Sequence, residues 1–568
     1  MLRARTLVLA TAAVAMFASA AQAGRGTDGQ LKILYWQAPS ILNPFLSGGT
    51  KDVDASSIII EPLAHYDEKG NIVAALAESV PTVANGGVAK DLKSITWQLK
   101  KGVVWSDGTP FTAADVEFTA DYCLHPEGGC NAAERFQDVT SVKAVGSHTV
   151  KITFGLAKPF PYGPFVGSTS PVIQKAQFKD CMGAKAPTCT KQNFGTIGTG
   201  PFKVKEFKPN DVVLYVMNEN YRDKNLPAFD SVLMKGGGDA VSAARAVLET
   251  GEFDYAWNLQ VEPEILSTMA KAGKGKVISA FGTSVERLMV QLTNPDSALG
   301  DKRATYQGGK NPHPFNKDPA VRRALSMAID RAILVDAGYG PAGQVTCNVL
   351  PAPAVYASTA NDWCKTQDVA GANKLLDDAG WKRGSDDVRA KDGVRLSLLY
   401  QTSTNSVRQG TQALIKQMWQ AIGVETELKN ISASVFFGGD QSSPDTFQKN
   451  FTDIEMYTNN FNGTDPESYM LRWTCDKMPS PATQWIGQNM PRYCDPKYDQ
   501  LAKDLAKTAA TAERAIIAKK MNDMLIEYGA IIPLIHRGAV AAHALSLGGV
   551  KQNVWDATPW NIQDWHRK

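Results

Sequence analysis

After its first two dozen residues, the 568-residue chain has no apolar run that approaches the roughly 20 residues needed to cross a bilayer. It also has little net charge, because 60 Lys and Arg stand against 57 Asp and Glu, which gives a formal charge of +3. The first absence excludes an internal transmembrane helix. The second excludes the strongly basic surface with which proteins bind nucleic acid or an anionic membrane.

The chain lacks the common catalytic and metal-binding motifs as well. It contains no G-x-S-x-G elbow, no H-E-x-x-H helix, no S-x-x-K motif and no C-x-x-C, and only seven histidines are available for acid–base work. None of those histidines lies at ligand spacing beside the cysteines. We therefore expect no enzyme activity, no cofactor and no metal site, and an exported hydrolase with an unfamiliar site is a distant alternative.

The N-terminus reads as a secretory signal peptide over residues 1–23. Arg3 and Arg5 precede an apolar run from Leu7 to Ala20, and Ala21–Ala23 ends in small residues. A basic start, a short apolar segment and an A-x-A site are the features of a cleavable signal, so we expect cleavage after Ala23. No cysteine follows that site. A mature protein free in the periplasm, without a lipid anchor, is the expectation.

The cysteines occur in four pairs that are close in sequence. Eight cysteines formally allow 105 connectivities, but in an oxidising compartment the clustering favours disulfides between neighbours. The expected pairs are Cys123 with Cys130, Cys181 with Cys189, Cys347 with Cys364, and Cys475 with Cys494.

Strand and helix patterns alternate along the whole chain, which indicates an α/β fold. Ser94–Leu99 alternates polar and apolar residues as a half-buried strand does, and Thr112 with an acidic residue three positions later predicts a helix start. Apolar residues recur at helical spacing over 319–335, 406–421 and 498–528. The length exceeds a single hydrophobic core of about 100–200 residues, so at least two lobes are expected.

The segment Thr96–Val116, with its Trp-Ser-Asp-Gly-Thr-Pro-Phe-Thr-Ala-Ala-Asp-Val end, closely resembles the signature of extracellular solute-binding protein family 5. Further landmarks resemble that family in the expected order: 63–81, Gly198–Phe202, Asn218–Tyr221, Val321–Arg331 and Ala379–Trp381. The turn at 107–110 is interpreted as structural, because its residues are those that end a strand and start a helix. The glycines at 198 and 200 are also interpreted as structural, since no Lys-Ser or Lys-Thr follows them to complete a phosphate-binding loop.

The resemblance implies a two-lobed periplasmic binding protein of class II type, with an extra subdomain in lobe I and a ligand cleft between the lobes. It places lobe I at 30–61, 196–283 and 534–568, the inserted subdomain at 62–195, and lobe II at 284–533. The two crossings near 280 and 533 would then act as the hinge.

Ligand contacts are expected at strand ends and helix starts that face the cleft. Tyr35 and Trp36 end the first strand, and Tyr255 and Trp257 lie where the first lobe of this family approaches its ligand, so these aromatic rings are candidates for ligand stacking. Ordinary core packing is the alternative for each of them. Arg408 is a candidate to bind a ligand carboxylate at a helix start, with a solvated helix arginine as its alternative.

The segment 456–466 resembles the loop from which peptide-binding relatives offer an aspartate to the ligand's ammonium group. By this resemblance the matching position is Asn460, and Asp465 follows after an insertion. An amide cannot replace a charge-assisted hydrogen bond worth about 1.5–3 kcal/mol. Either Asp465 has taken over the contact, or the ligand lacks a free ammonium group.

The resemblance implies the substrate-binding subunit of an ABC importer that captures a peptide or peptide-like solute and delivers it to a membrane permease and its ATPase. A monomer is expected, with a small-molecule or short-peptide ligand. The same importer class with an opine, a sugar conjugate or a metal chelate as solute is the alternative.

Overall fold

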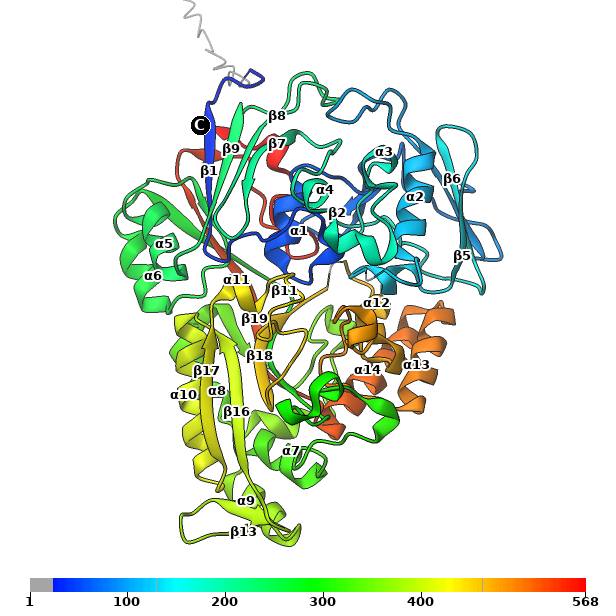
Figure 1. The fold of residues 1–568 in the computed structure, drawn as a ribbon. Coiled ribbons are helices and arrows are strands. Elements are labelled where there is room, and N and C mark those ends of the chain that lie inside the picture. Colours follow the sequence, from blue (N-terminus) through cyan, green and yellow to red (C-terminus); the bar gives the residue numbers. More distant parts are fainter. Residues whose placement is uncertain (1–23, 129, 462) are drawn as a thin grey trace, which may run out of the picture.

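The computed structural model describes residues 24–568 except 129 and 462, so the expected signal peptide lies outside the described residues. Two lobes are stacked one above the other, and both carry a mixed sheet flanked by helices (Figure 1). The α/β two-lobed class expected from the sequence is therefore confirmed. Within the described residues, no helix is both long and apolar enough to span a membrane.

One 11-stranded sheet runs through both lobes. Its hydrogen-bonded order is β17 (Glu425–Ile431), β16 (Ser397–Ser403), β18 (Ile454–Asn459), β11 (Gly275–Val290), β19 (Ile531–Ala544), β10 (Tyr255–Ala256), β1 (Gln30–Tyr35), β9 (Ser231–Gly236), β8 (Val212–Met217) and β7 (Phe202–Lys208), and β12 (Gly343–Val345) pairs with β19. We call the half with β1 and β7–β10 lobe I, and the half with β16–β18 lobe II.

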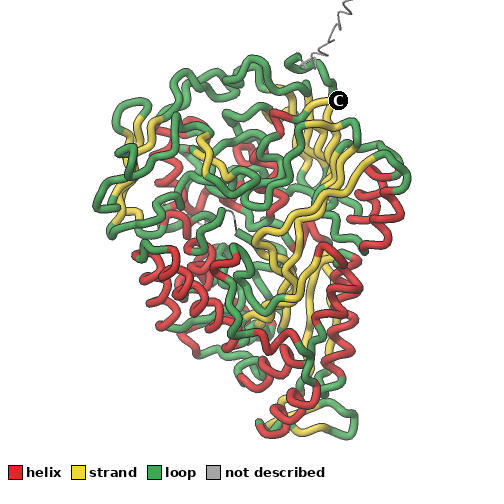
Figure 2. Tube along the Cα trace, turned by 180° about the vertical axis from the view of Figure 1, so that it is seen from behind, coloured by secondary structure: helices red, strands yellow, loops and turns green. Residues whose placement is uncertain are grey.

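The long strands β11 and β19 carry the chain from lobe I to lobe II and back (Figure 2). They pair antiparallel from Gly275 and Ala544 to Met289 and Ile531, with an interruption between Phe281 and Val285. A break in a ladder is where paired strands bend most readily. The interruption lies near 280, and a second register shift between Glu286 and Arg287 lies opposite Pro533, so the ladder is irregular where the hinge is expected. The hinge motion and the lobe bounds themselves stay predictions.

Helices cover the sheet in both lobes (Figure 1). Lobe I has α1 (Thr50–Ser57), α5 (Ala240–Leu248) and α6 (Pro263–Ala270), and lobe II has α7 (Pro319–Met327), α8 (Arg331–Gly338), α9 (Val369–Asp378), α10 (Ser406–Gln420), α11 (Ala433–Phe436), α12 (Glu467–Met470), α13 (Pro496–Lys507) and α14 (Thr511–Tyr528). The pattern over 319–335 forms two helices because Asp330 caps α8, accepting hydrogen bonds from the amides of Ala332 and Ile333.

A separate subdomain lies beside lobe I. Its sheet has the order β4 (Ser94–Gln98), β6 (Thr149–Phe154) and β5 (Val139–Ala144), and α2 (Ala113–Cys123) packs on it. The Asp115 carboxylate accepts a hydrogen bond from the Thr112 amide at 2.9 Å, which confirms the expected helix start. The shorter elements of lobe I and the subdomain are β2 (Ala64–Tyr66), β3 (Ile72–Ala74), α3 (Lys175–Phe178) and α4 (Thr190–Phe194). The remaining short strands are β13 (Lys382–Arg383), β14 (Arg389–Lys391), β15 (Val394–Arg395), β20 (Leu547–Gly548) and β21 (His566–Arg567).

Two sequence features have the structural roles expected of them. A Cβ at Gly198 would lie 1.7 Å from the Ile59 carbonyl oxygen, so this glycine permits close backbone approach. All four expected disulfides are present: Cys123–Cys130, Cys181–Cys189, Cys347–Cys364 and Cys475–Cys494, with sequence separations of 7, 8, 17 and 19 residues.

Candidate ligand-binding site

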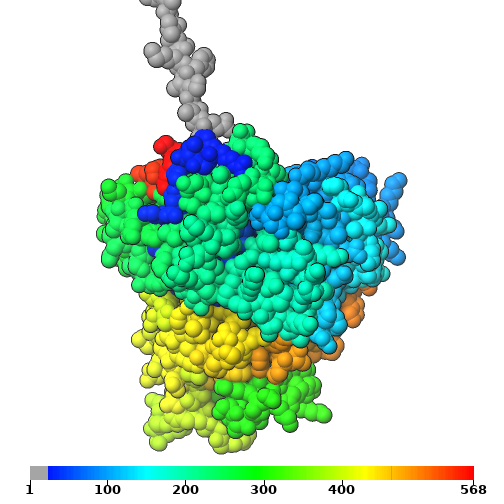
Figure 3. All heavy atoms as spheres, turned by 45° about the horizontal axis from the view of Figure 1, so that its top comes forward, coloured from blue at the N-terminus to red at the C-terminus, as the bar shows by residue number. Residues whose placement is uncertain are grey.

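A cavity of about 180 Å³ lies between the lobes and is lined by residues of both. Figure 3 shows the lobes in contact, with green and cyan atoms of lobe I and its subdomain above yellow and orange atoms of lobe II. This volume is well above the roughly 10–15 Å³ that a cavity needs to hold a single water molecule. Lobe I and the subdomain supply Asp54, Glu134, Trp257 and Asp556, and lobe II supplies Arg408, Phe437, Tyr457, Asn460 and Arg472, while Arg537 comes from β19. Groups of both charge signs therefore surround one space.

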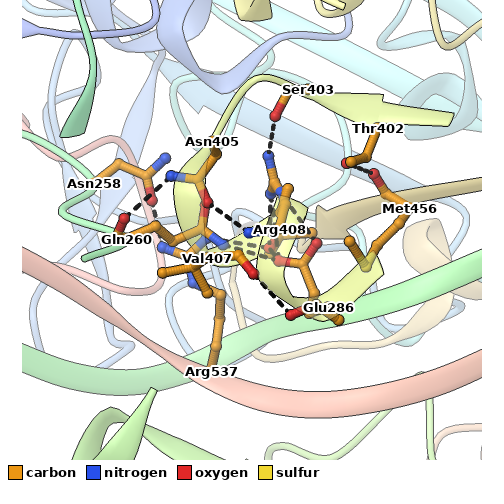
Figure 4. Close-up of polar contacts among 12 residues, drawn as sticks. Asn258, Gln260, Glu286, Thr402, Ser403, Asn405, Val407, Arg408, Met456 and Arg537 are labelled. Atoms are coloured by element: carbon orange, nitrogen blue, oxygen red, sulfur yellow. Dashed lines mark hydrogen bonds and ion pairs between the residues drawn. The ribbon is translucent and has the colours of Figure 1, made fainter. Parts of the chain in front are cut away.

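Arg408 begins helix α10 and points into a buried polar network (Figure 4). Its Nε donates to Glu286 Oε1 at 2.9 Å and its Nη1 donates to Ser403 Oγ at 3.0 Å. The side chains of Arg408 and Glu286 are only 2% and 0% exposed. Burial acts to raise the pKa of Glu286, but the Arg408 guanidinium outweighs it and holds that pKa below its ordinary value. Arg408 lines the cavity, yet its charge is already balanced within lobe II.

Arg537 enters the same network from β19 (Figure 4). Its Nη1 donates to Thr458 Oγ1 at 3.1 Å, and its Nη2 donates to Asn258 Oδ1. Both acceptors are neutral. Burial lowers the pKa of Arg537, because a guanidinium loses hydration there that neutral acceptors only partly replace.

On the lobe I wall, Asp54 of α1 is fully buried and lines the cavity. Its carboxylate accepts hydrogen bonds from the Tyr35 hydroxyl at 2.9 Å and the Thr558 amide at 3.2 Å. No Lys, Arg or His among the described residues forms an ion pair with it. Burial therefore dominates and raises the pKa of Asp54 to about 7.

Asp556 forms another acidic part of this wall, in a different environment. It accepts hydrogen bonds from the Tyr66 amide at 2.9 Å and the Ser168 amide at 2.8 Å, and it lies 3.3 Å from His65 Nδ1. Burial acts to raise its pKa, but the bond and the charge of His65 prevail and lower it. The cavity wall thus contains two different carboxyl groups: Asp556, whose lowered pKa favours the ionised form, and Asp54, whose raised pKa favours the protonated form.

Of the four aromatic candidates, only Trp257 lines the cavity. Tyr35 stacks on Trp257 with ring centroids 4.6 Å apart and supports it from the core side. The Trp36 indole donates to the Asn258 carbonyl oxygen at 2.8 Å, and Tyr255 packs against Trp565 at 5.1 Å. Tyr35, Trp36 and Tyr255 therefore have the core-packing role that was their alternative.

Asn460 lines the cavity at the end of β18, beside Arg472. Arg472 Nη1 donates to the Asn460 carbonyl oxygen at 2.9 Å and to Asn459 Oδ1 at 3.0 Å. Glu134 of the subdomain lies 3.8 Å from Arg472 Nε, across the interface between the lobes. At this point the cavity is lined by the amide of Asn460 and the guanidinium of Arg472, and not by a carboxylate.

Asp465 lies away from this cavity. Both of its carboxylate oxygens accept hydrogen bonds from Arg514 Nη2 at 2.6 Å, so its charge is matched inside lobe II. It borders a smaller cavity of about 30 Å³, where Lys158 of the subdomain forms an ion pair with Glu467 of α12. This geometry does not support Asp465 as the acceptor of a ligand ammonium group.

Charged residues that line the cavity but were not predicted from the sequence include Asp54, Arg472, Arg537 and Asp556. Arg537 had a visible signal, since it is a charged residue within the otherwise apolar strand 531–544. The other three stand in ordinary polar surroundings in the sequence. In the described residues, no group of three or more His, Cys, Asp or Glu side chains is placed to hold a metal ion.

Comparison with known proteins agrees with this architecture. The model of the bacterial extracellular solute-binding proteins, family 5 middle, matches residues 71–482. Protein XP55 of Streptomyces lividans is 29% identical over 401 residues, which are 70% of this chain and 66% of that protein, just under two thirds. The glutathione-binding protein GsiB of Escherichia coli K12 is 23% identical over 522 residues, 89% of each chain.

Solved structures share the fold at low identity. The oligopeptide-binding protein AppA from Bacillus subtilis, in complex with a nonapeptide, has a TM-score of 0.80 at 21% identity and covers 96% of this chain and 100% of its own. AgaA, in complex with agropinic acid, from A. tumefaciens R10 has a TM-score of 0.76 at 19% identity over 95% and 99% of the two chains. With the family match over most of its length, the chain belongs to family 5 of the bacterial extracellular solute-binding proteins.

Proposed function

We propose that the protein is the periplasmic substrate-binding subunit of an ABC importer and that it binds a peptide or peptide-like solute in the cavity between its lobes. The observation that carries this proposal is the cavity between the lobes, whose walls come from both lobes and hold carboxylates and guanidinium groups. Such a wall suits a small solute with charged groups at more than one point. GsiB is named for glutathione and AppA was solved with a nonapeptide, which supports a peptide-like solute here.

Solute capture would be coupled to closure of the lobes about β11 and β19. A ligand that shifts a two-state population from 1:99 to 99:1 must bind the favoured state about 5.5 kcal/mol more tightly. A micromolar ligand supplies about 8 kcal/mol in total, so most contacts must form only on closure. Walls contributed by both lobes meet this requirement, because opening separates Asp54 from Arg472 and Asn460.

Asp54 replaces Asp465 as the proposed acceptor of a cationic group. It is the cavity carboxylate whose partners are a hydroxyl and an amide, and a ligand ammonium beside it would stabilise its ionised form. Trp257 supplies an aromatic surface in the same lobe. An opine remains the second candidate solute, because AgaA shares the fold and was solved with agropinic acid.

Delivery would involve a membrane permease and its ATPase, with the protein acting as a monomer that leaves the solute chemically unchanged. Export by residues 1–23, without a lipid anchor, belongs to the same proposal. The lobe bounds at 62, 196, 284 and 534 also remain part of it.

The decisive experiment is native mass spectrometry of the protein purified from its own periplasm, followed by a thermal-shift screen of peptides, opines and sugars. We expect a bound peptide or peptide-like mass and a raised unfolding temperature with related peptides. A bound solute that is not a peptide would mean that the protein serves the same class of importer with a different solute. Chemical conversion of any tested solute would overturn the binding-protein assignment.

A further inference from the structure

The buried network between the lobes contains two guanidinium groups and one carboxylate. Arg408 and Glu286 form a close ion pair, with a second contact from Arg408 Nη2 to Glu286 Oε2 at 3.3 Å. Arg537 has no carboxylate oxygen within 4.0 Å in the part of the chain that the structure describes. The two guanidinium groups and the one carboxylate of this network therefore sum to a charge of +1.

Glu286 pairs directly with Arg408 and reaches Arg537 only through a hydroxyl group. Besides Arg408, its Oε2 accepts hydrogen bonds from the Thr458 hydroxyl, from Gln260 Nε2 at 3.1 Å and from the Tyr339 hydroxyl at 3.3 Å. The Thr458 oxygen that donates to Glu286 also accepts from Arg537 Nη1, so a neutral hydroxyl lies between the two charged groups. Glu286 thus forms its ion pair with Arg408 and leaves Arg537 without a direct one.

Arg537 is 5% exposed and borders the cavity, and its guanidinium group uses two of its five N–H donors on Thr458 and Asn258. A buried cation without an opposite charge is strongly unfavourable unless something else supplies that charge. The open side of Arg537 faces the space assigned to the solute. The missing negative charge is therefore expected there.

We propose that Arg537 binds a carboxylate of the solute, and this inference rests on the proposed solute-binding function. A carboxylate carries the single charge that the network lacks, and it matches the planar donor fork of a guanidinium. A phosphate would bring about −1.5 to −2 and over-compensate. The solute is accordingly an acid, and Arg408 is the positioning residue that holds Glu286 away from Arg537.

The position of Arg537 also links the acid to closure. Its two neutral partners come from different lobes, because Asn258 follows β10 of lobe I and Thr458 lies on β18 of lobe II. Arg537 itself lies on β19, which passes between the lobes. A carboxylate that fixes this guanidinium would stabilise both contacts at once, and so would stabilise the closed arrangement.

The test compares a pool of tripeptides as free acids with the same pool as C-terminal amides, by calorimetric titration of protein freed of endogenous solute. The wild-type protein should bind the acids about tenfold to a hundredfold more tightly, as expected for a charge-assisted contact. Arg537→Gln should reduce that ratio to near one, and Arg537→Lys should leave part of it. Arg395→Gln, at a part-exposed arginine that pairs with Glu425 and does not line the cavity, should leave the affinity for both pools unchanged.

Two results would overturn the inference: a wild-type protein that binds both pools equally, or an Arg537→Gln variant that keeps the preference. If neither pool binds the wild type, the peptide proposal fails, and the solute released from the purified protein decides the inference. An acid retained by the wild type and lost from Arg537→Gln supports it, and a neutral solute refutes it. The solute-free variant should unfold at a temperature no lower than the wild type, since it loses an unmatched charge; a clear fall would mean that the fold itself uses this charge.

Discussion

Replacing Asp54 by Asn should stabilise the solute-free protein, and the gain should grow with pH. The pKa of Asp54 is raised by burial from 3.8 to about 7, so folding favours its protonated form. A raised folded-state pKa gives stability that is fully present below pH 3.8 and is lost as the pH rises through about 7. At 1.36 kcal/mol for each unit, the loss is about 4 kcal/mol above pH 7. An Asn side chain does not ionise, so the variant avoids this loss of stability.

The substitution fits the local hydrogen bonds. The Thr558 amide can still donate to Oδ1, and the Tyr35 hydroxyl can rotate to accept from the new amide instead of donating. Because the shape is preserved, the difference between the two proteins reports the charge. We expect Asp54→Asn to weaken binding of a cationic solute while it raises stability, which is the usual conflict between a functional charge and a stable fold.

The assay is urea denaturation followed by tryptophan fluorescence, on protein freed of solute, between about pH 4 and pH 8. Asp556→Asn is the matched control on the same wall, because the pKa of Asp556 is lowered and its removal should destabilise the protein at neutral pH. Parallel stability curves for the wild type and Asp54→Asn across this range would refute the reasoning.

Three further predictions follow from the contacts across and beside the cavity. Asp465→Asn should cost about 3 kcal/mol of stability, because it leaves buried Arg514 with less opposite charge, and it should leave solute affinity unchanged; a large affinity loss would contradict the placement of Asp465. Lys158→Met should break the ion pair with Glu467 between the lobes, so small-angle scattering of the solute-bound protein should show a larger radius of gyration. An unchanged radius of gyration would mean that this ion pair does not hold the lobes together. Trp257→Ala should weaken solute binding by about 1–3 kcal/mol in calorimetric titration, and equal affinity would mean that the ring contributes only to the core.

The fold could be predicted closely where local chemistry is decisive. The turn and helix start at 107–115, the half-buried strand β4 and the cysteine pairs depend on residues close in sequence, and the structure has all of them. The break between α7 and α8 was not predicted, because apolar residues keep the helical spacing across it. The helical backbone is interrupted there because Asp330 caps the start of α8.

The site was harder to predict because its walls come from segments hundreds of residues apart. Tyr35 was chosen for its place at a strand end, yet in β1 it shares the core-facing side with Leu31 and Ile33, as the period of two requires. Trp257, Arg408 and Asn460 do line the cavity, and their contacts with a solute stay a prediction. Nothing in the sequence reveals that Glu286 neutralises Arg408 rather than Arg537, since that pairing depends on side-chain geometry.

The order of the disulfides has a consequence for how the chain is made. Counted along the chain, the first cysteine is joined to the second, the third to the fourth, the fifth to the sixth and the seventh to the eighth. Both members of each pair therefore precede the first member of the following pair. An oxidant that acts on the chain as it lengthens therefore meets one available partner at a time. Of the 105 arrangements open to eight cysteines, this is the one that N-to-C oxidation produces without later rearrangement. All four bridges also join cysteines that are at most 19 positions apart in the sequence, so none of them ties one lobe to the other.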